Sequence, residues 1–250
     1  MLSQILARRP AASIDQVVQI MTALDAILPE SDGLKWFNRL YLEVTLAVRR
    51  AVGADTTDST TTGTTTTFHD PRFMSALDVV FANLYFDAAA AGDASPSNAP
   101  PAWRPLFFAR HTAGLARIQW ALAGMNAHIN RDLPYAIVAT YQATGGAPHR
   151  ADPRHADFDR VNGILEAVEA QVKPQFAVGI VGQIDAVAGN VDDILAMWKI
   201  GAAREAAWTN AEVLWTLGSA GADRVLRDAF AANLDRFTGF AGRGLLVRTA

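Results

Sequence analysis

The chain has 250 residues, of which half are apolar and 19% are charged, a composition typical of a globular protein with a sizeable core. The net charge is −3 and the lysines and arginines are scattered, which argues against a phosphate-tracking surface and against nucleic acid as a partner. Cysteine is absent, which excludes disulfides, thiolate nucleophiles and cysteine-based metal centres.

The chain is expected to form one domain in the cytoplasm. Its composition does not change between the two halves, which favours a single domain over residues 1–250. Arg8 and Arg9 stand where a signal peptide would need its apolar stretch, and no later apolar run is long enough to span a bilayer. We therefore expect a cytoplasmic protein with no membrane span.

The first two helices are marked by their caps. Ser13 and Gln16 have the spacing of a capping box, and apolar residues recur at helical spacing from there to Pro29. Asp32 can cap a second helix, which is apolar on one side and carries lysine and arginine on the other. This two-sided pattern predicts a helix on the surface of the domain.

A loop and a buried helix follow. Residues 54–67 are nearly all threonine with aspartate, serine and glycine, which predicts a mobile loop of low complexity. The Asp-Pro pair at 70–71 caps and opens a third helix. That helix is apolar on both faces and should be buried, so Asp78, Asn83 and Asp87 cannot all reach water.

A long helix is expected in the middle of the chain. After a proline-rich linker at 93–105, the stretch from Leu106 to about Arg131 predicts one unbroken helix of about 40 Å. Its alanines and glycines point in every direction, which lets neighbouring helices approach closely on all sides. We expect this to be the central helix of the fold, ended by the Leu-Pro pair at 133–134.

The rest of the sequence is also helical in pattern. Apolar stripes, caps and stops predict further helices over these approximate ranges: 132–141, 158–172, 174–184, 190–217 and 222–237. No segment shows the sustained alternation that a sheet would need. The predicted fold class is all-α, a single-domain bundle of about eight or nine helices around a long central helix.

The end of the expected central helix holds the densest cluster of hydrogen-bonding groups in any apolar part of the chain. His128 and Asp132 are spaced i and i+4, which places an imidazole and a carboxylate on one helix face. There they could form an oriented acid–base pair or share a metal ion such as zinc. The structural alternative is that Asp132 only caps the next helix and that His128 is a half-buried side chain with satisfied hydrogen bonds.

A second face of the same helix carries neutral polar side chains. Thr112, Gln119, Asn126 and Asn130 fall on this face at helical spacing. Because buried amides must be hydrogen-bonded, the four form either a structural network or the polar wall of a ligand cavity. In the second case Gln119, Asn126 and Asn130 would bind the substrate.

Arg204 stands within the apolar stripe of the helix expected at 190–217. Its neighbours along that stripe are apolar or small, so the guanidinium needs a buried partner. Asp78, Asp87 and Asp132 are the candidate counter-charges. Such a pair would serve either fold specificity or the recognition of an anionic group.

Three strings carry a resemblance to a known family: WFNRLYLEVT at 36–45, DPRF at 70–73 and NAHINRDLP at 126–134. They resemble a family of bacterial and fungal proteins classed only as a domain of unknown function. The likeness covers most of the chain and implies an all-α fold, but it brings no known catalytic residues.

A fainter similarity is to the all-α zinc-dependent phospholipase C and nuclease group, in which an HxxxD sequence on a helix binds zinc. Only His128 and Asp132 match that pattern here, and the further histidine ligands and the HxxxE of the group are absent.

The sequence leaves two classes of function open. The first is an enzyme that acts on a small organic molecule in a cavity beside the central helix. His128 would be its acid–base group or metal ligand, and Asp132 would orient His128 or join it as a ligand. The second is a non-catalytic binding or scaffold protein whose polar groups satisfy one another. A cavity that touches His128 would favour the first class.

Overall fold

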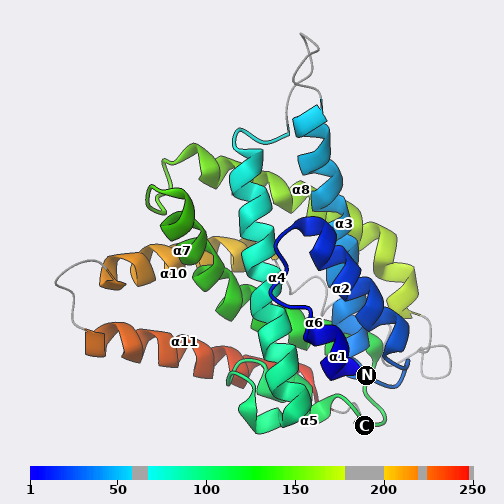
Figure 1. Cartoon of the computed structure of the whole chain (residues 1–250). Coiled ribbons are helices and arrows are strands. Elements are labelled where there is room, and N and C mark those ends of the chain that lie inside the picture. The colour runs from blue at the N-terminus through cyan, green and yellow to red at the C-terminus, as the bar shows by residue number, and fades with distance from the viewer. Residues whose placement is uncertain (58–66, 178–199, 219–223, 248–250) are drawn as a thin grey trace.

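The chain folds as a bundle of helices around one central helix (Figure 1). The computed structural model describes residues 1–57, 67–177, 200–218 and 224–247. Over these ranges the protein is all-α with no strand, as predicted. The helices are α1 (Leu2–Leu6), α2 (Ile14–Ile27), α3 (Gly33–Thr57), α4 (Pro71–Ala94), α5 (Arg104–Ala109), α6 (Arg117–Ala127), α7 (Leu133–Thr144), α8 (Pro153–Ala177), α10 (Ile200–Gly218) and α11 (Arg224–Leu245). A 3₁₀ turn at Pro96–Asn98 and a π turn at His128–Asp132 differ from them in pitch.

The central helix consists of α6, the π turn and α7, which follow one another without a break. The predicted helix from Leu106 to Arg131 was therefore wrong at its start. That stretch is interrupted after Ala109, and Gly114 in the interruption has a φ of 84°, which lies outside the helical region.

The predicted break at Pro134 was also wrong. In a regular α-helix the proline ring would crowd the Asn130 carbonyl, and its missing N–H would leave that carbonyl unbonded. The π turn just before it has a wider pitch, with the Leu133 N–H donating to the His128 carbonyl five residues back. The helix continues through the proline because the turn in front of it is widened.

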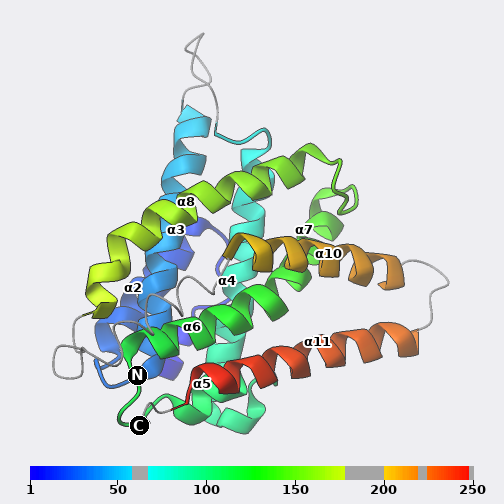
Figure 2. The same cartoon turned by 180° about the vertical axis from the view of Figure 1, so that it is seen from behind.

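Four helices pack around the central helix. α6 lies against α3 and α11, and α7 lies against α4 and α10. Seen from behind, α10 and α11 run alongside α6 and α7 (Figure 2). The close approach of α6 to α3 depends on Gly124, where a β-carbon would overlap the ring of Phe37.

The start of α3 is fixed by a buried ion pair. The Asp32 carboxylate accepts a hydrogen bond from the Leu34 N–H at 2.9 Å, which confirms the predicted cap. The same carboxylate pairs with Arg110, whose Nη2 lies 2.6 Å from Oδ2. The expectation that this helix lies on the surface was wrong in its first half, because Trp36 and Phe37 are completely buried.

The boundaries of the expected loops shift in the structure. α3 continues to Thr57, and residues 58–66 of the expected loop at 54–67 lie outside the described residues. The linker expected at 93–105 contains the end of α4, the 3₁₀ turn and the first residues of α5.

The C-terminal helices differ in length from the predictions. α8 runs to Ala177, so no new helix begins at Pro174. The helix predicted at 190–217 is described from Ile200 onward, and its expected start at Asn190 lies outside the described residues. α11 extends beyond the predicted end at 237 to Leu245.

Within the described ranges, α4 is the one helix long and apolar enough to cross a membrane by length and composition. Half of its most apolar window is buried inside the fold. Its N-cap is Asp70, which accepts a hydrogen bond from the Phe73 N–H at 2.9 Å as predicted. Asp78 is buried in this helix, whereas Asp87 is exposed and pairs with Arg9.

Candidate functional site

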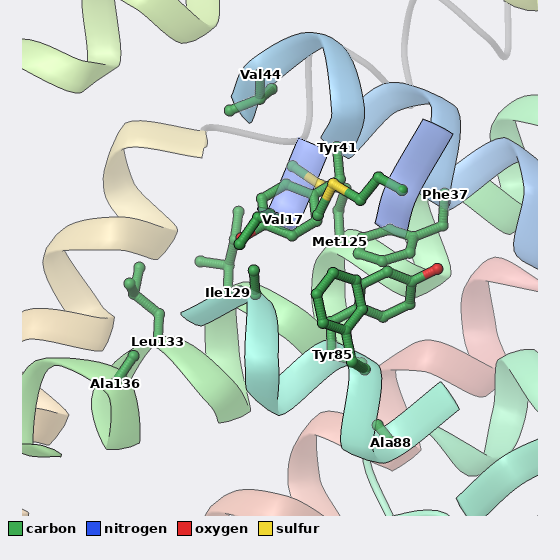
Figure 3. Packing of buried hydrophobic residues seen from close by; sticks show 14 of the residues in the cluster. Val17, Phe37, Tyr41, Val44, Tyr85, Ala88, Met125, Ile129, Leu133 and Ala136 are labelled. Atoms are coloured by element: carbon green, nitrogen blue, oxygen red, sulfur yellow. The ribbon is translucent and has the colours of Figure 1, made fainter. Parts of the chain in front are cut away.

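A cavity of about 60 Å³ lies between α3, α4, the central helix, α8 and α10, which is room for several water molecules. Most of its lining is apolar. Figure 3 shows Tyr41 and Val44 of α3 on one side of this region and Ile129 and Leu133 of the central helix on the other. The polar lining side chains come from four different helical segments: Tyr41, Asp78, His128 and Arg204.

His128 and Asp132 form a hydrogen-bonded pair inside the π turn. Nδ1 of His128 lies 3.0 Å from Oδ2 of Asp132, and the two side chains are 1% and 0% exposed. Because a carboxylate can only accept, a neutral His128 carries its proton on Nδ1. The spacing read from the sequence therefore brings these two groups together.

Asp132 is held on the far side by two further donors. Trp103 Nε1 donates to Oδ2 at 2.9 Å, and Arg131 Nη1 donates to Oδ1 at 2.6 Å. Its side chain makes no cap hydrogen bond to α7, so the capping role considered for Asp132 was wrong. The carboxylate instead orients the imidazole.

Aromatic rings fix the plane of the imidazole. Phe81 stacks on His128 with ring centroids 3.5 Å apart and an interplanar angle of 3°. Tyr41 meets the ring edge-on at 4.5 Å between centroids, and Phe37 does so at 5.6 Å. The imidazole therefore has a single orientation available to it.

The other nitrogen of His128, Nε2, is buried and has no hydrogen-bond partner among the described residues. Burial lowers the pKa of His128, although the hydrogen bond and the charge of Asp132 oppose the shift. The imidazole is thus neutral near pH 7, with the lone pair of Nε2 free. This is the state in which a histidine accepts a proton.

Asp78 and Tyr41 add two more buried groups without partners. The Asp78 Oδ2 and the Tyr41 hydroxyl have no hydrogen-bond partner in the described part of the chain. Burial raises the pKa of Asp78 to about 7. Burial, aided by the charge of Asp78, also raises the pKa of Tyr41 well above its usual value. Both groups can therefore donate a proton or a hydrogen bond into the cavity.

Only a partial signal for these two residues is present in the sequence. Asp78 lies in a helix that is apolar on both faces, and this pattern indicates a buried carboxylate that could serve Arg204 as a counter-charge. Tyr41 follows the apolar spacing of α3, which does not mark it as a functional residue, and its ring lies in the core. The cavity that joins them exists only in the tertiary structure.

Arg204 is buried as predicted, but the predicted carboxylate partner is not there. Its Nε donates to Asn162 Oδ1 at 2.8 Å and its Nη2 to the Phe158 carbonyl at 2.7 Å. Asp87 is exposed, and Asp132 is bound by the three groups described above. Asp78 lines the same cavity as Arg204, but the two form no ion pair.

The amides of the central helix face α11 and do not line the cavity. Gln119 Nε2 donates to the Leu245 and Val247 carbonyls, and Asn126 Nδ2 donates to the Thr238 carbonyl at 2.9 Å. Asn130 Nδ2 donates to Asn126 Oδ1 at 3.0 Å. Of the two alternatives that the sequence left open, a structural network or the wall of a ligand cavity, these contacts match the network. Thr112 lies outside the central helix and does not share its face.

Two places in the described part of the chain bring together side chains that could bind a metal ion: the His128–Asp132 pair, and a group in α8 and α10. Asp132 bonds His128 directly, and both of its carboxylate oxygens already accept hydrogen bonds, so a shared zinc ion would have to displace these contacts. In the described part of the chain, one group of three side chains could hold a metal ion: His155, Asp159 and Glu205. Arg150 pairs with Glu205 there at 3.1 Å, which adds a competing positive charge.

An open groove of about 700 Å³ lies between α5 and α11 and is lined by arginines and Phe108. None of the buried polar atoms without partners lies in it. The buried polar atoms without partners that are described lie instead in or near the central helix, and three of their residues line the cavity beside His128: Tyr41, Asp78 and His128.

The fold and the cavity define an all-α protein with an oriented histidine–aspartate pair beside a buried apolar chamber. The chain belongs to a family of unknown function, DUF5995, whose model matches residues 14–248. No curated protein and no solved structure matches the chain. The resemblance to an uncharacterised family is therefore confirmed, and the site must be interpreted from its own geometry.

Proposed function

We propose that the protein is an enzyme that performs acid–base chemistry on a small organic molecule bound in the cavity. The observation that carries the proposal is the free Nε2 of His128, buried at the cavity with Nδ1 held by Asp132. A purely structural histidine in such a place would leave an acceptor unsatisfied, which costs roughly 1–3 kcal/mol. A ligand in the cavity that bonds to Nε2 would offset this cost.

The four polar groups divide into roles. His128 accepts a proton from the ligand at Nε2, and Asp132 stabilises the imidazolium that forms because it is a carboxylate 3.0 Å from Nδ1. Asp78, which stays protonated up to about pH 7, returns a proton or donates a hydrogen bond to a developing anion. Tyr41 is a second neutral donor.

The competing function is binding without chemistry, and one experiment separates the two. Small alcohols, aldehydes, ketones, esters and acids are incubated with the protein in heavy water, and proton NMR follows the exchange of their C–H groups for deuterium. An enzymatic base at His128 exchanges the protons of at least one compound class. His128→Gln abolishes the exchange, and Asp132→Asn slows it by about 10²–10⁴-fold.

The matched control is His111→Gln, because His111 is exposed and does not line the cavity. It keeps the parent rate. Exchange that is absent for every compound, or that His128→Gln leaves at the parent rate, contradicts a catalytic role and favours the binding protein.

A further inference from the structure

We infer that the ligand of the cavity carries a carboxylate group, which pairs with Arg204. The inference rests on the proposed function in one respect, that a small molecule occupies the cavity beside His128. It adds the chemical class of that molecule.

The buried lysine and arginine side chains differ in their counter-charges. Lys35, Arg110 and Arg204 are 6%, 8% and 6% exposed. Lys35 lies 3.9 Å from an Asp25 oxygen, and Arg110 lies 2.6 Å from an Asp32 oxygen. Arg204 forms no ion pair with any carboxylate in the described part of the chain. A buried cation without a counter-charge is strongly unfavourable, so an anion is expected beside it.

The guanidinium of Arg204 has a fixed orientation. Neutral groups hold it in place: Asn162 and the Phe158 carbonyl accept from Nε and Nη2, and the Phe158 ring lies 3.9 Å from its central carbon. The two side-chain hydrogen bonds of Arg204 within the described residues use Nε and Nη2. A guanidinium held by neutral acceptors keeps its full charge, with donors left over for a planar, two-oxygen anion.

Burial lowers the pKa of Arg204 to about 10, and the more distant charges of Asp159 and Glu205 offset this only in part. The group is therefore still a cation at neutral pH. Arg110 shows the contrast, because the hydrogen bonds and charge of Asp32 outweigh its burial and raise its pKa.

The rest of the lining suits an anion as well. Among the described residues that line the cavity, Asp78 is the one carboxyl group, and it is uncharged below about pH 7, so it does not repel an anionic ligand. Tyr41 and protonated Asp78 are both donors. The apolar walls and the volume of about 60 Å³ suit a short hydrocarbon body, and a single arginine neutralises one negative charge. A short monocarboxylate meets all of these conditions.

The test compares acids with amides of the same shape. Acetate, propanoate and butanoate, and the three corresponding amides, are titrated into the protein by calorimetry. Because hydrogen bonds to charged groups contribute about 1.5–3 kcal/mol, the best acid should bind about tenfold to hundredfold tighter than its amide. Arg204→Met removes this preference. Arg204→Lys, which keeps the charge but loses the planar fork, retains part of it.

A second variant guards against a folding defect in Arg204→Met. Asn162→Leu keeps the arginine but removes the acceptor of its Nε, so it weakens acid binding and leaves amide binding unchanged. Circular dichroism verifies that each variant is folded. Equal binding of acid and amide, no binding of any acid, a preference that persists in folded Arg204→Met, or acid binding that folded Asn162→Leu leaves at the parent affinity would overturn the inference.

The outcomes also separate this inference from the proposed function. Acids that bind through Arg204 with no His128-dependent exchange uphold the ligand class and contradict the catalytic role. Exchange that depends on His128 but occurs only with neutral compounds upholds the catalytic role and contradicts the carboxylate ligand.

Discussion

Nδ1 of His128 lies 3.0 Å from Oδ2 of Asp132 across the π turn that joins α6 to α7. π turns occur frequently at functional sites, and this one lets the central helix pass Pro134 while holding both side chains toward its buried side. The ring nitrogens of His128 report on this hydrogen bond, and their protonation can be measured by NMR.

Nitrogen NMR should show neutral His128 with its proton on Nδ1 and with a pKa below the usual value for histidine. Burial lowers this pKa, while Asp132 raises it. Asp132→Asn removes the opposing charge, so the pKa of His128 should fall further. The exposed Asp15→Asn serves as the control and leaves the His128 signals unchanged. A His128 that titrates at the usual pKa, or a pKa that rises in Asp132→Asn, would show that the pair is not formed.

The second prediction concerns Asp78 and pH. The folded protein keeps this proton up to about pH 7, whereas an unfolded chain releases it near pH 4, the usual range for aspartate. The contribution of Asp78 to stability is therefore complete below about pH 4 and is lost as the pH rises to about 7. About three pH units at 1.36 kcal/mol each correspond to a loss of roughly 4 kcal/mol.

Asp78→Asn does not titrate and escapes this loss. Urea unfolding should find the variant close to the parent at pH 4 and more stable than the parent at pH 8, by up to roughly 4 kcal/mol. Asp87→Asn is the control, because Asp87 lies in an exposed pair with Arg9. A parent and an Asp78→Asn variant with the same pH dependence would mean that Asp78 is ionised in the folded protein.

The sequence predicted the helices well because an apolar stripe of helical period requires burial on one side, and every such stripe is a helix here within the described residues. It misplaced the ends of the central helix for local reasons. Proline at 134 signals a break in an α-helix, but a π turn removes the clash, and the helical spacing of the apolar residues does not distinguish the two cases.

The site was predictable only where one helix carries it. His128 and Asp132 lie in the same central helix, so their i,i+4 spacing was enough to predict that their side chains meet. Arg204 was correctly expected to be buried, but its partners come from α8, and the choice between an amide and a carboxylate depends on how two helices cross. The same holds for Asp78 and Tyr41, which meet His128 only because α3, α4 and the central helix converge.

The third prediction is that the buried pair of Asp32 and Arg110 contributes strongly to stability. Arg110→Met leaves Asp32 buried without a counter-charge, so the free energy of unfolding should fall by about 3–5 kcal/mol. Arg49→Met is the matched control, because it breaks an exposed pair with Asp15 and should cost less than about 1 kcal/mol. Similar losses of unfolding free energy in both variants would show that the burial of the Asp32–Arg110 pair adds nothing to its contribution to stability.

The last prediction links packing to the site through Gly124. A β-carbon at this position would overlap the ring of Phe37, which itself packs edge-on against His128. Gly124→Ala should therefore destabilise the protein by about 1–3 kcal/mol, the usual cost of overpacking, despite the higher helix propensity of alanine.

Gly163 in α8 provides the opposite case, since a β-carbon there meets nothing within 4 Å. Gly163→Ala should stabilise the protein by about 1 kcal/mol through helix propensity alone. Because a displaced Phe37 loosens the stack around the imidazole, Gly124→Ala should also shift the NMR signals of His128, and Gly163→Ala should not. Urea unfolding and the same nitrogen spectra measure both effects. If the two alanine variants gain stability equally, then α6 and α3 are not in the close contact on which the shape of the cavity depends.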